Sequence, residues 1–96
     1  RFEEGITKLD LDYTLSSLAN PIRRNILRLL NSRKSMRLME LVRELGIEDH
    51  TKVVFHLKVL KESGIIEQDK DKSYSLTEEG ERILSGLKIL ENYLSA

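Results

Sequence analysis

The chain has 96 residues, of which 40% are hydrophobic and 33% are charged, and its formal net charge is zero. A chain of this length can bury one modest core, and it has no apolar run of the roughly 18–20 residues that a membrane span requires. Cysteine is absent, which excludes disulfides and thiolate metal sites and suits a reducing compartment. We therefore expect one cytoplasmic domain over residues 1–96, with no membrane partner.

Three helices are predicted in the first half of the chain from apolar residues at helical spacing. Their approximate bounds are 9–19, 21–33 and 38–45. The second begins at Asn20 and Pro21, an N-cap followed by proline at the first helical position. A short extended link, residues 35–37, leads to the third, which ends at Gly46 because glycine commonly follows the last helical residue.

A fourth helix, a hairpin and a long last helix are predicted in the second half. The fourth helix covers about residues 50–63. The runs IIEQD and SYSLT, joined by KDK, are rich in strand-forming residues and predict a β-hairpin. The sequence TEEG begins the last helix, about residues 77–95, with a threonine cap and acidic residues in the first turn. The order α-α-(β)-α-α-β-β-α, mainly α with a small β-hairpin wing, is that of a winged helix-turn-helix.

Charge is unevenly distributed along these elements. Residues 21–61 contain ten Lys or Arg against four Asp or Glu, so the middle of the chain has an excess of six positive charges and the rest an equal negative excess. A basic patch of this kind attracts a polyanion even when the whole chain is neutral. The alternative interpretation is that charges on amphipathic helices cluster by chance.

Several segments together resemble the ArsR-like winged-helix transcriptional regulators. They are LANPIRRNILRLL, MELVRELGI, HLKVLKESGIIE and YSLTEEG, and the resemblance covers about residues 13–84. The spacing between Gly46 and FHLKVL is most similar to an archaeal subgroup. The resemblance implies a DNA-binding fold and a dimer formed through the terminal helices.

The resemblance does not extend to metal sensing. ArsR-like metal sensors bind their effector through Cys in the third helix, or through Asp and His near the terminal helix. Here the third helix lacks Cys and the last helix lacks His. His50 and His56 are six residues apart on the fourth helix and do not share a face. No metal site and no cofactor are therefore expected.

The fourth predicted helix has apolar residues on two faces. Val53, Leu57 and Leu60 form the stripe expected to face the core, and Phe55 lies nearly opposite at about 100° per residue. This outward face is what a recognition helix presents to the major groove of double-stranded DNA. The candidate contacts on this helix are His50, Thr51, Lys52, Val54, Phe55, His56 and Lys58. The alternative is that Phe55 and Val59 pack beneath the hairpin or the first helix.

The chemistry of this face suits a DNA groove. Lys52 and Lys58 can bind phosphates or guanine edges, and Thr51 can hydrogen-bond a base or a phosphate. Phe55 and Val54 can contact thymine methyl groups. For His56, which lies beside the core stripe, packing and a phosphate contact both remain open.

Basic residues elsewhere are further candidates for phosphate contacts. They are Arg23, Arg24, Arg37, Lys70 and Lys72. Arg37 lies at a helix N-terminus, which is a natural phosphate site. The two hairpin lysines alternate with aspartates, so we expect the wing to add little net attraction.

The last helix carries a heptad-like apolar seam. Together with the first helix it is predicted to form a dimer interface that includes Leu11, Leu15, Ile83, Leu87, Leu90, Tyr93 and Leu94. A second subunit would bury apolar surface that a domain of this size cannot cover by itself. The alternative is a helix folded back on its own core.

The sequence thus predicts a homodimeric, sequence-specific regulator of transcription that binds double-stranded DNA. The chain has no Gly-rich phosphate loop and no Ser/His/Asp pattern, so an enzyme is not expected. No small-molecule effector can be named from the sequence. The alternative function is a winged-helix adaptor that binds another protein and not DNA.

Overall fold

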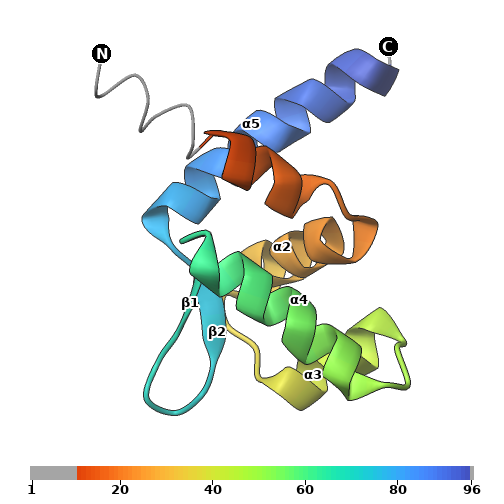
Figure 1. Ribbon diagram of the computed structural model, residues 1–96, viewed down its shortest axis with the longest axis vertical. Helices are drawn as coiled ribbons and strands as arrows, with labels where there is room; N and C mark the ends of the chain where they lie inside the picture. The colour runs from red at the N-terminus through yellow and green to blue at the C-terminus, as the bar shows by residue number, and fades with distance from the viewer. Residues whose placement is uncertain (1–10, 96) are drawn as a thin grey trace.

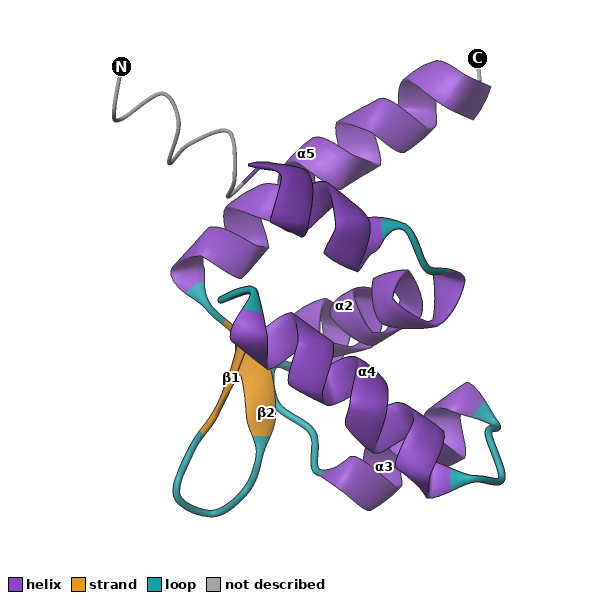
Figure 2. Cartoon of the chain, in the orientation of Figure 1, coloured by secondary structure: helices purple, strands orange, loops and turns teal. Residues whose placement is uncertain are grey.

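The computed structural model describes residues 11–95 and consists of helices around one small antiparallel hairpin (Figures 1 and 2). Residues 11–18 are helical. The elements that follow are α2 (Pro21–Arg33), α3 (Leu38–Leu45), α4 (His50–Glu62), β1 (Ile66–Gln68), β2 (Tyr74–Leu76) and α5 (Glu78–Ser95). The predicted fold class, a winged helix-turn-helix, is confirmed. Residues 9 and 10 of the first predicted helix lie outside the described residues.

The helix boundaries follow from local capping. The Asn20 side chain accepts hydrogen bonds from the backbone N–H groups of Ile22 (2.9 Å) and Arg23 (3.2 Å), which satisfies two free donors at the start of α2. Gly46 ends α3 in the left-handed conformation with φ of 67°. Its N–H donates to the carbonyl of Val42 at 3.0 Å. These caps turn the chain sharply between consecutive helices.

The hairpin is short and is extended by one further bridge. Ile66 pairs with Leu76, and Gln68 pairs with Tyr74. On its other edge Tyr74 exchanges backbone hydrogen bonds of 2.8 and 3.0 Å with Met36, in the link predicted to be extended. The hairpin is therefore anchored to the segment between α2 and α3, and the wing has a fixed place beside them.

One apolar core joins all the helices. α2 lies at its centre and contacts α3, α4, α5 and β2. The buried hydrophobic residues are Ile26, Leu27, Leu30, Met36, Leu41, Val53, Leu57, Leu60, Ile65, Ile66, Tyr74 and Leu84. Only the first part of α5 contributes to this core, through Leu84. Its C-terminal part extends beyond the body of the domain, beside the helix of residues 11–18 (Figure 1).

Candidate nucleic-acid interface

α4 separates an apolar face from an exposed face. Val53, Leu57 and Leu60 are buried, as predicted from their spacing. Phe55 is 58% exposed and Val54 is 42% exposed. The expectation that Phe55 points away from the core is confirmed, and its packing beneath the hairpin or the first helix is excluded. Its contact with DNA remains a prediction.

Thr51 and Asp49 form the cap at the start of α4. Asp49 Oδ1 accepts from the Thr51 hydroxyl at 2.5 Å and from the Thr51 N–H at 3.0 Å. These two hydrogen bonds favour the carboxylate and lower the pKa of Asp49. Because the Thr51 proton is directed at Asp49, its hydroxyl offers an approaching ligand only an acceptor in this arrangement. His50, Thr51, Lys52 and Lys58 are all exposed.

His56 does not belong to the exposed face, which corrects its inclusion among the DNA contacts. Its side chain is buried, with 8% exposure, and its Nδ1 lies 3.1 Å from Nη1 of Arg23. A guanidinium can only donate, so Nδ1 must be an unprotonated acceptor. Burial and then the charge of Arg23 lower the pKa of His56. His56 is therefore a structural link between α4 and α2.

Arg23 and Arg24 are also placed differently from the phosphate contacts expected of them. Arg23 Nε donates to the carbonyl of Ser17 at 2.7 Å, and Arg24 Nη1 donates to the carbonyl of Leu18 at 2.8 Å. Both guanidinium groups therefore bind the C-terminal end of the first helix, where the helix dipole favours a cation. The two guanidinium groups are thus engaged within the protein. Helical spacing alone does not show that the first helix ends beside them.

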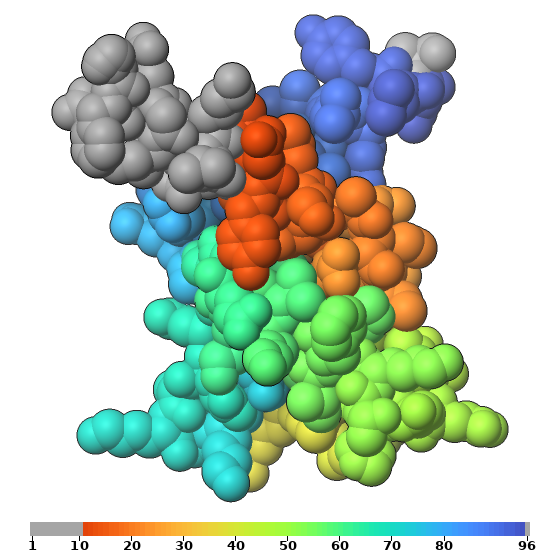
Figure 3. Space-filling model, in the orientation of Figure 1, coloured from red at the N-terminus to blue at the C-terminus, as the bar shows by residue number. Residues whose placement is uncertain are grey.

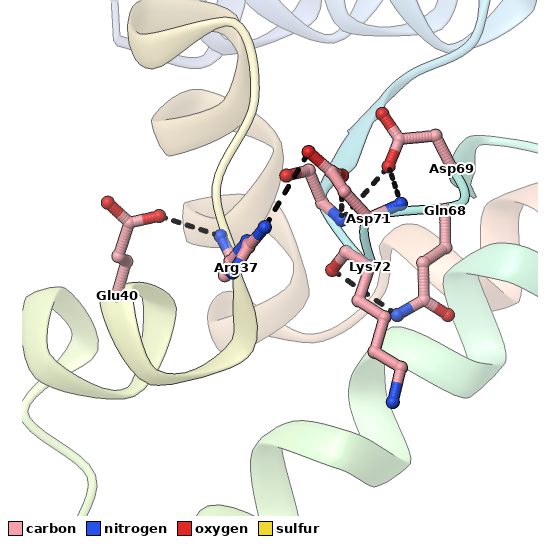
Figure 4. A network of polar contacts seen from close by, with 7 residues as sticks. Arg37, Glu40, Gln68, Asp69, Asp71 and Lys72 are labelled. Carbon is pink, nitrogen blue, oxygen red and sulfur yellow. Dashed lines mark hydrogen bonds and ion pairs between the residues drawn. The ribbon is translucent and has the colours of Figure 1, made fainter.

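The N-terminus of α3 and the hairpin tip are joined by an ion pair (Figure 4). Arg37 Nη2 lies 3.7 Å from Asp71 Oδ2, and the Arg37 N–H donates to Glu40 Oε1 at 2.8 Å. Both side chains of the pair are exposed, so its effect on stability is small. The Arg37 charge stays accessible at the helix N-terminus, but Asp71 partly neutralises it.

Aspartates also organise the hairpin tip. Asp69 Oδ1 accepts from the backbone N–H groups of Asp71 (3.1 Å) and Ser73 (3.2 Å), and Lys72 has a positive φ of 71° (Figure 4). Hydrogen bonding with the Asp69 side chain, and then with Ser73, lowers the pKa of Asp71 to about 2. Lys70 and Lys72 are exposed on this tip, with the two carboxylates beside them.

The candidate interface thus contains fewer residues than the sequence predicts, because Arg23, Arg24 and His56 bind within the protein. It consists of the exposed side of α4, the N-terminus of α3 and the hairpin tip, which form the lower half of the molecule in Figures 1 and 3. Of the predicted basic contacts, those that remain exposed on it are Lys52, Lys58, Arg37, Lys70 and Lys72. The helix of residues 11–18 and the end of α5 lie at the opposite end.

That opposite end carries an apolar groove. It measures about 460 Å³ and is lined by Leu15, Leu18, Ala19, Arg24, Leu87, Leu90, Glu91 and Leu94. Leu90 is 52% exposed, and Tyr93 and Leu94 are each 77% exposed. Leu11 and Leu15 are also exposed. Ile83 and Leu87 are instead partly buried against the core, so only the C-terminal part of the predicted seam is free.

An ion pair that sequence reasoning missed connects α5 to α2. Arg28 Nη2 donates to Glu91 Oε2. This hydrogen bond is the main cause of the lowered pKa of Glu91. The two residues are 63 positions apart, so local sequence patterns do not indicate that they meet.

Comparisons with known proteins agree with this architecture. A family model described as a helix-turn-helix domain matches residues 18–69, more than half of the chain. A crystal structure of M.tuberculosis Rv0081 is similar with a TM-score of 0.70 and 28% sequence identity, over 94% of this chain and 93% of that chain. No curated protein matches the sequence.

Two further findings concern the described residues only. Residues 11–95 contain no group of three or more His, Asp or Glu placed to hold a metal ion. In the same part of the chain no helix is both long and apolar enough to cross a membrane.

Proposed function

The chain belongs to the helix-turn-helix domain family, and on this basis we propose that it is a sequence-specific regulator that binds double-stranded DNA, with α4 in the major groove. The observation that carries this proposal is the exposed face of α4. Phe55 and Val54 are exposed there although they are apolar, and Lys52 and Lys58 lie on the same helix. In a DNA groove, the two apolar side chains can contact thymine methyl groups, and the two lysines can bind phosphates or guanine edges.

The surrounding elements support the same docking. The N-terminus of α3 presents Arg37, and backbone N–H groups at a helix N-terminus favour a phosphate. Lys70 and Lys72 project from the hairpin tip, although Asp69 and Asp71 reduce its net charge. We therefore expect most of the affinity to come from the helices, with the wing as an auxiliary contact.

We propose further that the protein acts as a homodimer of the ArsR-like, archaeal-type subgroup. The segments LANPIRRNILRLL and HLKVLKESGIIE support the ArsR-like resemblance, and the spacing between Gly46 and FHLKVL supports the archaeal type. The groove between residues 11–18 and the last turns of α5 supports the dimer, because Leu90 and Leu94 line it and are exposed. A two-fold arrangement of these helices would present two α4 helices to successive major grooves.

Selection of binding sites from a pool of random duplexes tests the proposal directly. The purified chain should enrich a common sequence with two-fold symmetry. Fluorescence anisotropy should then show tighter binding to the enriched duplex than to a shuffled one. Binding should weaken steeply with salt, because each neutralised phosphate contributes about −0.9 to the log–log slope. Failure to retain any duplex at low salt would instead favour a protein-binding adaptor, for which the exposed Phe55 would be the docking residue.

A further inference from the structure

Arg23 joins three separate elements through one guanidinium group. Its Nε donates to the Ser17 carbonyl (2.7 Å) and its Nη2 to the Ser16 carbonyl (3.4 Å), both in the last turn of the first helix. Its Nη1 donates to Nδ1 of His56 (3.1 Å) in the middle of α4. The side chain itself belongs to the first turn of α2. One residue thus connects the groove helix of residues 11–18 to the proposed recognition helix.

The surroundings hold this guanidinium in place. Ser17 is 1% exposed and its hydroxyl donates to the Tyr13 carbonyl at 3.0 Å, which fixes the last turn of the first helix. The free carbonyls at that turn form the negative end of a helix dipole. Arg23 has a planar set of donors that can bind several acceptors at once, which a lysine cannot reproduce.

The contact with His56 depends on the protonation state of the imidazole. Nδ1 must carry a lone pair, so the neutral ring holds its proton on Nε2. A second proton would replace the lone pair by an N–H group that faces a guanidinium. Arg23 from α2 is the charged group in contact with the ring, while the first helix contributes only the uncharged carbonyls of Ser16 and Ser17 to this cluster. On α4 itself, Lys52 lies one turn before His56 and adds a second positive charge to its surroundings.

We propose that Arg23 is a positioning residue that holds α4 against the first helix, and that protonation of His56 releases this contact and weakens sequence-specific DNA binding. The inference rests on the proposed DNA-binding function. In a dimer formed through the first and last helices, the Arg23–His56 contact fixes each recognition helix relative to the two-fold axis. The two half-sites of a binding sequence lie at a fixed spacing, which both recognition helices must match. A dimer in which α4 is loosened therefore loses more affinity for the selected duplex than for random DNA.

The test compares affinity for the selected and shuffled duplexes at about pH 7.5 and about pH 4.5, because burial and the charge of Arg23 lower the pKa of His56 below the ordinary histidine value. All proteins carry His50→Gln, so that His56 is the single histidine of the chain. In this reference protein, affinity for the selected duplex should fall at least about fivefold at the lower pH, the lower end of typical coupling between sites. His56→Asn, whose side-chain oxygen can replace Nδ1 as acceptor, should remove this pH dependence. Arg23→Lys should bind the selected duplex weakly at both pH values.

Equal pH responses in the reference protein and in folded His56→Asn would overturn the proposal. If His56→Asn does not fold, imidazole ¹⁵N chemical shifts of the reference protein decide the matter. They should show the Nε2–H tautomer, whereas an Nδ1–H tautomer would overturn the proposal. If no duplex binds at either pH, the DNA-binding function itself is wrong and the regulatory inference falls with it. The chemical shifts then still report whether the Arg23–His56 contact exists.

Discussion

The backbone of Gly80 in the first turn of α5 lies directly against the carbonyl of Ile65, such that a Cβ on Gly80 would come within 2.1 Å of the Ile65 oxygen. The same junction is tied by Thr77, whose hydroxyl donates to the Gly64 carbonyl at 2.7 Å and accepts from the Gly80 N–H at 2.9 Å. The end of α4 and the start of α5 are therefore fixed to each other by close backbone contact.

Gly80→Ala should destabilise the protein by about 1–3 kcal/mol, because the added methyl group overpacks against backbone that cannot move aside. Gly86→Ala on the same helix is the matched control, since nothing lies within 4 Å of its Cβ position. That change should stabilise by up to about 1 kcal/mol through helix propensity. Urea unfolding of the two variants measures both effects, and a Gly80→Ala protein as stable as Gly86→Ala would contradict the close contact.

Phe55→Ala should leave the fold intact and cost about 1–3 kcal/mol of binding to the selected duplex, the scale of one base contact. Its affinity for a shuffled duplex should change little, because an apolar ring does not bind phosphate. Anisotropy measures the two affinities, and a thermal melt serves as the control. Leu57→Ala, on the buried face of the same helix, should instead lower the melting temperature sharply. A similar drop for Phe55→Ala would show that Phe55 supports the core.

Lys58→Ala should weaken binding to both duplexes alike and reduce the salt slope by about one unit, if Lys58 contacts a phosphate. Arg24→Ala is the informative comparison, because its guanidinium binds the Leu18 carbonyl at the end of the first helix. We expect no change in slope for that variant. Titrations at several salt concentrations measure the slopes, and a reduced slope for Arg24→Ala would mean that DNA reaches the groove end of the molecule.

Leu90→Glu combined with Leu94→Glu should convert a dimer into monomers, because both side chains line the groove and are exposed on the free part of α5. Leu87 is left unchanged, since it is partly buried against the core and its replacement by a charged residue would also destabilise the fold. Light scattering gives the mass of each protein, and circular dichroism checks that the core remains folded. An unmodified chain that is already monomeric would contradict the proposed dimer.

Protein stability should decrease as the pH falls below about 6.5. The pKa of His56 is lowered in the folded state, so the unfolded chain takes up this proton first. The contribution of neutral His56 to the free energy of unfolding is therefore fully present above the unfolded histidine pKa of about 6.5. It is lost as the pH falls from there towards the lowered pKa of the folded state. Asp49, Asp71 and Glu91 also have lowered pKa values, so a second loss is expected below about pH 4. Thermal melts at a series of pH values separate the two steps, and the first should vanish in His56→Asn.

Periodicity and capping signals were enough to predict most of the fold. The Asn20–Pro21 start, the Gly46 end and the hairpin are all local features, and the structure contains each of them. The exposed position of Phe55 also followed from helical geometry, because the buried stripe of α4 determines its opposite face.

The parts of the candidate site that could not be predicted depend on contacts between distant segments. Arg23 and His56 are 33 residues apart. The sequence makes both of them candidate DNA contacts and leaves packing open for His56, but it does not indicate that the two side chains meet. The placement predicted for Arg24 differs from the structure for the same reason. A helical wheel does not show that the end of the preceding helix lies beside the Arg24 side chain. The close approach of Gly80 to Ile65 likewise requires the path of α5 across the end of α4.

The last turns of α5 have an energetic consequence for assembly. They extend past the core, and Ile89, Tyr93 and Leu94 have little packing of their own within the described chain. A helical end with few tertiary contacts frays, and its amide protons exchange with solvent faster than those of the core. In a dimer the same turns would gain a partner and become protected, so part of the association free energy is spent on ordering them. Helix content at the C-terminus would then rise with protein concentration, which couples the amount of protein in the cell to the formation of its own interface.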